Sequence, residues 1–137
     1  MARSTKFREQ HVDILRLASE LHKLRPEQLV RDPAAARSLL SKLLGKLSLH
    51  LAIEDRSLYP ELQKSPDAEI ATLGKRFETE MGGVADGMAA WGKRWSTPTA
   101  IQARPDRFVA ETAAIVATLK NRIHRENQEL YPALDVL

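Results

Sequence analysis

The chain contains no cysteine, and this absence removes several classes of protein at once. Without thiols there is no disulfide scaffold, no cysteine-based zinc site, no iron–sulfur cluster and no thiol catalysis. Long apolar runs are also missing, since no stretch approaches the roughly 18 residues of a membrane span. The first basic residues are not followed by the apolar core of a signal peptide, so we expect a cytoplasmic protein that does not associate with membranes.

A large excess of one charge is missing as well. The chain has 21 Lys and Arg residues against 18 Asp and Glu residues, a net charge of +3 over 137 residues. The two signs are interleaved, and aromatic residues make up only 5% of the chain. This pattern argues against nucleic acid as a partner. The length suits a single domain, which we predict over residues 1–137.

Alternating strand patterns are absent, and helical periodicity is present instead. Apolar residues recur at steps of three and four, which is the spacing of one buried helix face. Asp32 before Pro33 and Ser65 before Pro66 are each typical of an N-cap followed by proline in the first helical turn. We predict an all-α fold, an antiparallel up-down-up-down four-helix bundle with helices over residues 4–24, 33–62, 66–95 and 105–134.

The second and fourth predicted helices resemble each other when one is shifted along the sequence onto the other. Glu54 then coincides with Glu126, and the Leu-Tyr-Pro triplet at 58–60 coincides with the same triplet at 130–132. The first predicted helix matches the third in a similar way. The bundle therefore looks like two copies of one helix pair.

The same alignment shows what the second copy lacks. His50 of the first copy coincides with Arg122 of the second. His11, on the first predicted helix, coincides with Met81 on the third. Both histidines of the first helix pair therefore have no counterpart in the second pair.

The inward-facing stripes carry ionisable residues where a bundle core is normally apolar. These residues are His11, His50, Glu54, Arg122 and Glu126. A buried charge without a partner costs roughly several kcal/mol, so this polar layer needs an explanation. A His and a Glu four residues apart on one helix face present a nitrogen and a carboxylate to the same point, which suits iron, manganese or zinc. We predict a metal site formed by two histidines and two glutamates: His11, His50, Glu54 and Glu126.

Two segments resemble the signature of a known family. Residues 50–60 (HLAIEDRSLYP) are similar to the His-x-x-x-Glu-Glu-x-x-Leu-Phe/Tyr-Pro motif of hemerythrin-like (HHE cation-binding) domains. Residues 122–132 (RIHRENQELYP) are similar to its second occurrence, with Arg in place of the first His. The resemblance implies a four-helix bundle that holds a non-haem di-iron centre. It also implies a role in O2 carriage, in sensing O2, NO or iron, or in peroxide or nitrosative stress.

The resemblance also implies which residues serve which iron. His11 and His50 match the histidine ligands of one iron. Glu54 and Glu126 match the two carboxylates that bridge the pair of irons. The histidine positions of the other iron are those that the second helix pair has lost.

The sequence leaves three possibilities for this altered site, namely one metal ion, none or two. Arg122 could take the place of the second ion between Glu54 and Glu126, which leaves one ion of iron, or of manganese or zinc, at the two histidines. Arg122 and the same glutamates could instead close an ion-pair network that binds no metal. Two metals would require Glu80 or another ligand near Met81.

A site with one metal or none argues against O2 carriage, because the family uses two irons for that purpose. We therefore expect a sensing, regulatory or metal-binding protein, with O2 or NO as a gas ligand if metal is bound. The alternative is a metal-free interaction module whose surface binds another protein. The sequence contains neither a nucleophile–base pair nor a phosphate-binding loop, so we do not expect an enzyme. A weak oxidase or peroxidase at a single iron is the one enzymatic interpretation left.

Four further residues receive simpler interpretations. His22 lies three turns from His11, and His124 is rotated away from the inward stripe, so we predict that both face solvent. Tyr59 and Tyr131 lie near helix ends, where a half-buried ring with a solvated hydroxyl is the ordinary arrangement.

Overall fold

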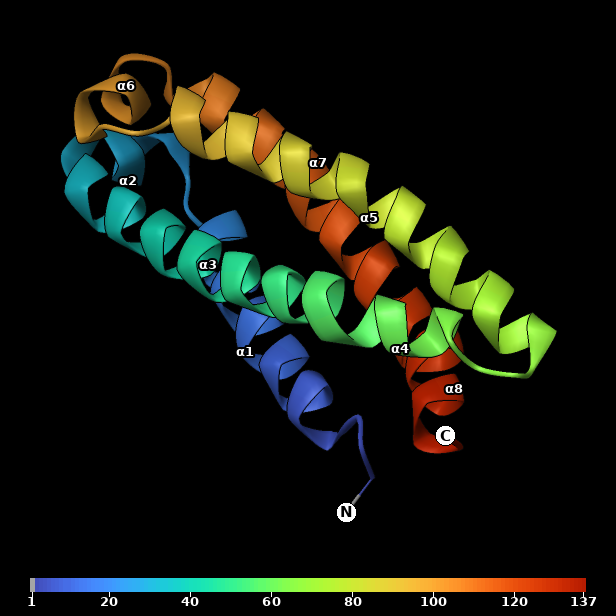
Figure 1. Cartoon of the computed structure of the whole chain (residues 1–137). Coiled ribbons are helices and arrows are strands. Elements are labelled where there is room, and N and C mark those ends of the chain that lie inside the picture. Colours follow the sequence, from blue (N-terminus) through green and yellow to red (C-terminus); the bar gives the residue numbers. More distant parts are fainter. Residues whose placement is uncertain (1) are drawn as a thin grey trace.

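Helices make up almost all of the chain that the structure describes, residues 2–137 of a computed structural model (Figure 1). In chain order they are α1 (Thr5–His22), α2 (Pro26–Arg31), α3 (Pro33–Ile53), the π-helical turn η1 (Glu54–Leu58), α4 (Tyr59–Gln63), α5 (Ala68–Arg94), α6 (Pro98–Ala103), α7 (Pro105–Arg125), the π-helical turn η2 (Glu126–Leu130) and α8 (Tyr131–Asp135). No strand occurs within residues 2–137, which confirms the predicted all-α fold. Within the same residues, no helix combines the length and the apolar character that crossing a membrane requires.

Four long rods form the bundle, in the order that the sequence predicts. The first rod is α1, the second runs through α3, η1 and α4, the third is α5, and the fourth runs through α7, η2 and α8. α1 packs against α3 and α7, while α5 packs against α3, α4 and η2. The short helices α2 and α6 lie together at the end of the bundle opposite the two termini (Figure 1).

Each π-helical turn begins at a glutamate of the sequence repeat. The backbone keeps right-handed helical angles at Glu54 (φ −62°, ψ −45°) and at Glu126 (φ −62°, ψ −44°), so neither rod breaks. Each turn ends two residues before a proline, Pro60 or Pro132. Proline lacks an N–H and clashes with the carbonyl four residues earlier, and the wider turn accommodates both effects. The sequence predicts the two rods but not these turns.

The two linkers that connect the rods at the α2–α6 end are helical, a feature that the sequence did not reveal. α2 and α6 begin with Pro26 and Pro98, at a position where the missing N–H costs nothing. Each helix buries one apolar side chain, Leu29 in α2 and Ile101 in α6. Because the two helices also contact each other, they close this end of the core.

Of the two N-caps predicted from the sequence, one is confirmed and one is wrong. The Asp32 carboxylate accepts a hydrogen bond from the backbone N–H of Ala35, 3.2 Å away, at the start of α3. Ser65 does not cap α5, because its hydroxyl oxygen accepts from the N–H of Asp67, which precedes the helix. Asp67 caps α5 instead, and the rod begins after Pro66 rather than at it.

Two apolar clusters fill the interior, one on either side of a layer of ionisable side chains. The larger cluster lies toward α2 and α6 and includes Trp91, and the smaller lies toward the termini and includes Phe77. The buried side chains of the layer between them are His11, His50, Glu54, Arg122 and Glu126. The fold therefore buries every ionisable residue that was predicted to face inward.

Candidate metal centre

Three of the four rods contribute the residues of the predicted metal site. His11 comes from α1, His50 from the last turn of α3, and Glu54 and Glu126 from the first positions of the two π-helical turns. One donor atom from each of the four lies within 4.8 Å of the other three, and all four side chains are buried. The Nε2 atom of His11 is 3.1 Å from Nε2 of His50. The structure thus brings together all four residues selected from the sequence; their binding of a metal stays a prediction.

The two imidazole rings are held with the same nitrogen turned inward. Nδ1 of His11 is 2.9 Å from the side-chain oxygen of Asn127, and Nδ1 of His50 is 2.6 Å from that of Gln10. An amide oxygen only accepts hydrogen bonds, so each Nδ1 carries the proton and donates it outward. In a neutral ring Nε2 is then left with a lone pair, and the two lone pairs face each other across 3.1 Å. Such an arrangement is stable only with a cation, a proton or a metal ion, between the rings.

We expect Asn127→Ala to weaken metal binding by about 10- to 100-fold, because partners that orient a histidine ligand carry an effect of that size. Loss of the Asn127 oxygen removes the acceptor that holds Nδ1–H of His11. A competition titration against a chelator measures the affinity. Gln128→Ala, at the exposed neighbouring position, serves as the matched control. Equal affinities for the two variants would contradict this role of Asn127.

The carboxylates and His50 form a strongly interacting group in the metal-free protein. Burial on its own lowers the pKa of His50, but hydrogen bonds to Glu126 and Glu54 outweigh it and raise the pKa to about 9. Burial raises the pKa of Glu54 to about 7, with the neighbouring Glu126 carboxylate adding to the effect. Burial on its own would also raise the pKa of Glu126. Hydrogen bonds with His11 and His50 outweigh burial and lower this pKa to about 2. At neutral pH, protonated His50 therefore balances the negative charge of Glu126.

Metal binding is expected to strengthen as the pH rises from about 6 to about 9, because the ion must displace protons from its ligands. The pKa values of His50 and Glu54 both lie above the ordinary values, so the metal-free fold is more stable at lower pH. It loses that stability as the pH rises through 7 and 9. Thermal unfolding with and without metal measures both effects. The rise in Tm on adding metal should be larger at pH 9, and a smaller rise there would contradict the expectation.

The positions of the two missing histidines are occupied by Met81 and Arg122, whose side chains contact each other. Nε of Arg122 lies 3.2 Å from Sδ of Met81. Nη1 of Arg122 donates to Oε2 of Glu80 at 2.6 Å, and the same oxygen accepts from Nη1 of Arg125 at 2.7 Å. Glu80 is thus bound by two guanidinium groups. Both arginines bind its Oε2 and would compete with a second metal for this carboxylate.

One expectation for Arg122 is wrong. Two of the three possibilities left open by the sequence placed its guanidinium with the two glutamates of the site, but in residues 2–137 no ion pair joins Arg122 to Glu54 or Glu126. The side chain reaches across to α5 instead. Its partner there is Glu80, whose side chain is 35% exposed and therefore less costly to keep charged than a buried carboxylate.

The four side chains of the cluster form a donor set that fits a metal ion. In the described part of the chain, Oε2 of Glu126 is buried without a hydrogen-bond partner, while Oε1 of the same carboxylate lies 2.8 Å from Nε2 of His11. Two imidazole nitrogens with two carboxylates make a set typical of iron, manganese or zinc. At the second position, a guanidinium has no lone pair to offer, and the thioether of Met81 is a poor ligand for hard ions. The residues that would hold the ion are His11, His50, Glu54 and Glu126.

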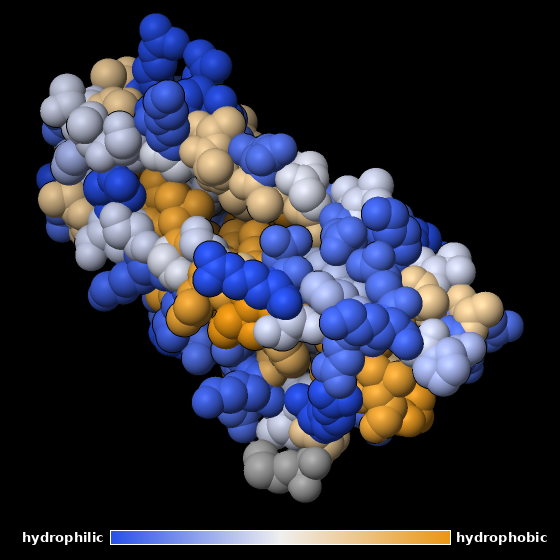
Figure 2. All heavy atoms as spheres, viewed as in Figure 1, coloured by the Kyte–Doolittle hydropathy of each residue, from blue (hydrophilic) through white to orange (hydrophobic). Residues whose placement is uncertain are grey.

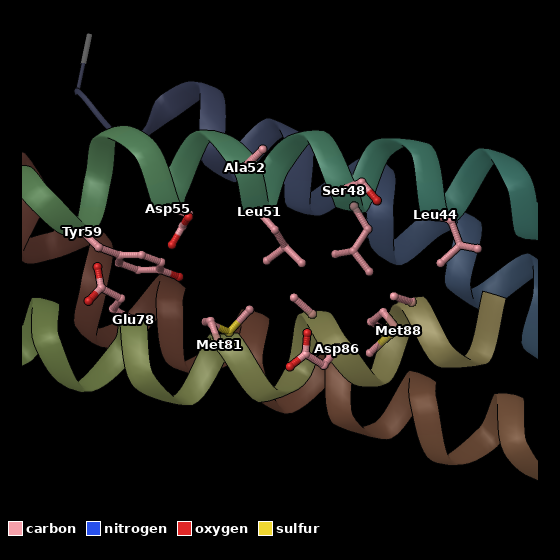
Figure 3. A pocket seen from close by; sticks show the side chains of 14 residues that line it. Leu44, Ser48, Leu51, Ala52, Asp55, Tyr59, Glu78, Met81, Asp86 and Met88 are labelled. Carbon is pink, nitrogen blue, oxygen red and sulfur yellow. The ribbon is translucent and has the colours of Figure 1, made fainter. Parts of the chain in front are cut away.

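A groove lies between the second and third rods, and none of the four cluster residues lines it. It has a volume of about 540 Å³ and lies between α3 with η1 and α5 (Figure 3). Its walls are mostly apolar, and Figure 2 shows hydrophobic side chains at the bottom of the hollow. Tyr59 and Met81 line it, and each touches the polar layer, through Glu54 and Arg122 respectively. Tyr59 and Met81 therefore separate the groove from the buried cluster.

Three residues that touch the site were not identified from the sequence. Gln10 and Asn127 orient the imidazoles, and their only signal is that each adjoins a ligand position in the chain. Tyr131 was expected to have a solvated hydroxyl, and so was Tyr59. This expectation is wrong, because both tyrosines are buried and their hydroxyls point into the polar layer. The predicted exposure of His22 and His124 is confirmed.

The bundle and its buried cluster define a class, helical-bundle proteins with a histidine–carboxylate cluster between the helices that could hold a metal ion. The family model described as Hemerythrin HHE cation binding domain matches residues 3–134. The chain therefore belongs to the hemerythrin HHE family, as its two motif segments indicated. No curated protein and no solved structure matches the chain.

Proposed function

We propose that the chain binds one metal ion in its buried cluster, with iron as the first candidate and manganese or zinc as alternatives. The proposed ligands are His11, His50, Glu54 and Glu126. We further propose that it is a cytoplasmic sensing or regulatory protein that neither carries O2 nor acts as an enzyme. The family match and the buried cluster of His11, His50, Glu54 and Glu126, which could hold a metal ion, support this proposal.

The orientation of the two imidazoles carries the proposal. Both rings turn Nε2 inward, and both are held there by amide oxygens on the far side. The ion-pair network of Arg122 alone would not require this arrangement, since Arg122 does not contact either ring. A metal ion would supply the positive charge that the inward-turned nitrogens and the two buried carboxylates require, in place of the proton on His50.

Arg122 supports a single ion in place of two. Its guanidinium is permanently charged, lies at a position where the family has a histidine ligand, and is 9% exposed. A second divalent ion beside it would meet direct Coulomb repulsion in a poorly solvated layer. Since the family's O2 carriage depends on two irons, a single ion supports a regulatory role.

Gas binding by the ferrous protein tests the proposed role. The chain is loaded with ferrous iron without air, and portions are then titrated with NO or cycled between O2 and vacuum. We expect one NO per chain and no reversible oxygenation. Reversible O2 uptake with two irons per chain would contradict the proposal.

The metal-free interaction module stays the second candidate, for one specific reason. With His50 protonated and Arg122 paired to Glu80, the layer already carries two positive groups near its carboxylates. A metal-free bundle of this kind is therefore electrostatically possible. The two candidates separate on His50→Ala, which should abolish a metal-dependent function and leave a surface interaction intact.

A further inference from the structure

Tyr131 places its hydroxyl among the donor atoms of the metal site. Its Oη lies 3.0 Å from Nε2 of His11 and 3.4 Å from Nε2 of His50. The hydroxyl donates a hydrogen bond to Oε2 of Glu54 at 3.0 Å. The tyrosine is completely buried, so this oxygen has no contact with solvent. One phenol oxygen is therefore close to three of the four proposed ligands.

These separations match those between neighbouring ligands of a single ion. Two donor atoms about 2.1 Å from a metal and at right angles lie about 3.0 Å apart. The two imidazole nitrogens, at 3.1 Å, show this spacing, and so does the pair formed by His11 and Glu126, at 2.8 Å. Tyr131 Oη repeats it toward His11 and toward Glu54. The phenol oxygen thus occupies a further vertex of the same donor arrangement.

Neighbouring side chains hold the Tyr131 ring in this position. Phe7 stacks on it with ring centroids 5.6 Å apart, and the guanidinium of Arg8 lies 5.4 Å from its centroid. Arg8 also donates to the backbone carbonyl of Asn127, which ties this contact to the residue that orients His11. The ring cannot turn away without breaking contacts with α1.

The second tyrosine of the sequence repeat is placed differently, although the repeat relates the two. Tyr59 approaches the layer only through Oε1 of Glu54, at 3.5 Å, and no hydrogen bond joins it to a histidine in the described residues. Its ring lines the groove beside Met81 (Figure 3). Tyr59 therefore belongs to the position that has lost its histidines, and Tyr131 to the position that keeps them.

We propose that Tyr131 is a fifth ligand of the ion held by the two histidines and two glutamates. This inference rests on the proposed metal site and names a residue that the family motif does not assign to it. Phenolate is a hard oxygen donor and suits ferric iron. On binding, the metal–oxygen bond replaces the O–H bond of Tyr131, and the proton is released to solvent.

Ferric iron is the probe, because a phenolate bound to it gives a visible charge-transfer band and characteristic tyrosine ring vibrations in resonance Raman spectra. Protein loaded with ferric iron should show both signals. Tyr131→Phe should lose them while keeping its iron, and Tyr59→Phe, the matched control, should keep them. Since the chain has only two tyrosines, a band that persists in Tyr59→Phe assigns the ligand to Tyr131 even if the other variant does not fold.

The outcomes separate this inference from the proposed function. Bound iron without a phenolate band would overturn the inference and leave the metal site in place. A band that disappears in Tyr59→Phe and persists in Tyr131→Phe would also overturn it. Failure of the unaltered chain to bind iron, manganese or zinc would contradict the metal site itself, and this inference with it.

Discussion

A variant carrying Met81→His and Arg122→His is expected to bind two metal ions per chain, against the one ion proposed for the unaltered chain. The two side chains already converge, with Nε of Arg122 3.2 Å from Sδ of Met81. Histidines at these positions would restore the pair of ligands that the sequence repeat has lost. The change also removes the guanidinium charge that repels a second cation.

Elemental analysis after reconstitution with ferrous iron measures this gain. Met81→His alone, with Arg122 retained, is the control, and it should stay at one ion because the repelling charge remains. Glu80 keeps Arg125 as a partner in the double variant, so its carboxylate is not left unpaired. Circular dichroism checks that the bundle is intact. A folded double variant that still binds a single ion would contradict this account, because the two lost histidines would then not explain the lack of a second metal ion.

His50→Ala is expected to lower metal affinity by more than about a hundredfold, since losing only the partner of a ligand already costs about 10- to 100-fold. His50 is in contact with every other member of the cluster, from His11 at 3.1 Å to Glu126 at 3.7 Å. Its removal also takes away the protonated group that balances Glu126 in the metal-free protein. The increase in Tm caused by metal should therefore disappear.

His124→Ala provides the control for this variant. His124 lies on the same rod as Glu126 but is exposed, so it should neither lose metal nor change the metal-induced rise in Tm. Equilibrium dialysis with ferrous iron or zinc measures the affinities of both variants. Equal metal binding by His50→Ala and His124→Ala would remove the proposed site and favour the metal-free module.

The long rods were predictable because their signal is repeated many times along the chain. Apolar residues at steps of three and four specify each buried face, and Asp32 caps its helix through a local hydrogen bond. The π-helical turns were not predictable, since a turn of five residues adds no periodicity of its own. Pro60 and Pro132 were the only signals for them. The N-cap of α5 was misplaced because Ser65 and Asp67 are both good cap residues on either side of one proline.

The four residues of the cluster were predictable because their spacing on the predicted helices and their positions in the sequence repeat both indicate the same inward-facing layer. The partner of Arg122 was not, since it depends on which side chain of a different rod lies nearest. That side chain is Glu80, at the more exposed edge of the layer. Gln10 and Asn127 were missed for a related reason. Each of them is adjacent to a proposed ligand in the sequence and is therefore rotated about 100° away from it around the helix. The helical pattern consequently predicts a surface position for each.

The central claim is that the chain holds one metal ion, and metal content per chain tests it most directly. The protein is purified without added metal or chelator, and its iron, manganese and zinc are measured by elemental analysis. One ion per chain is the expected result. Two ions per chain would contradict the claim and would make Met81 and Arg122 compatible with a full di-metal centre. No metal, together with no uptake from ferrous iron, manganese or zinc, would contradict it in the opposite direction.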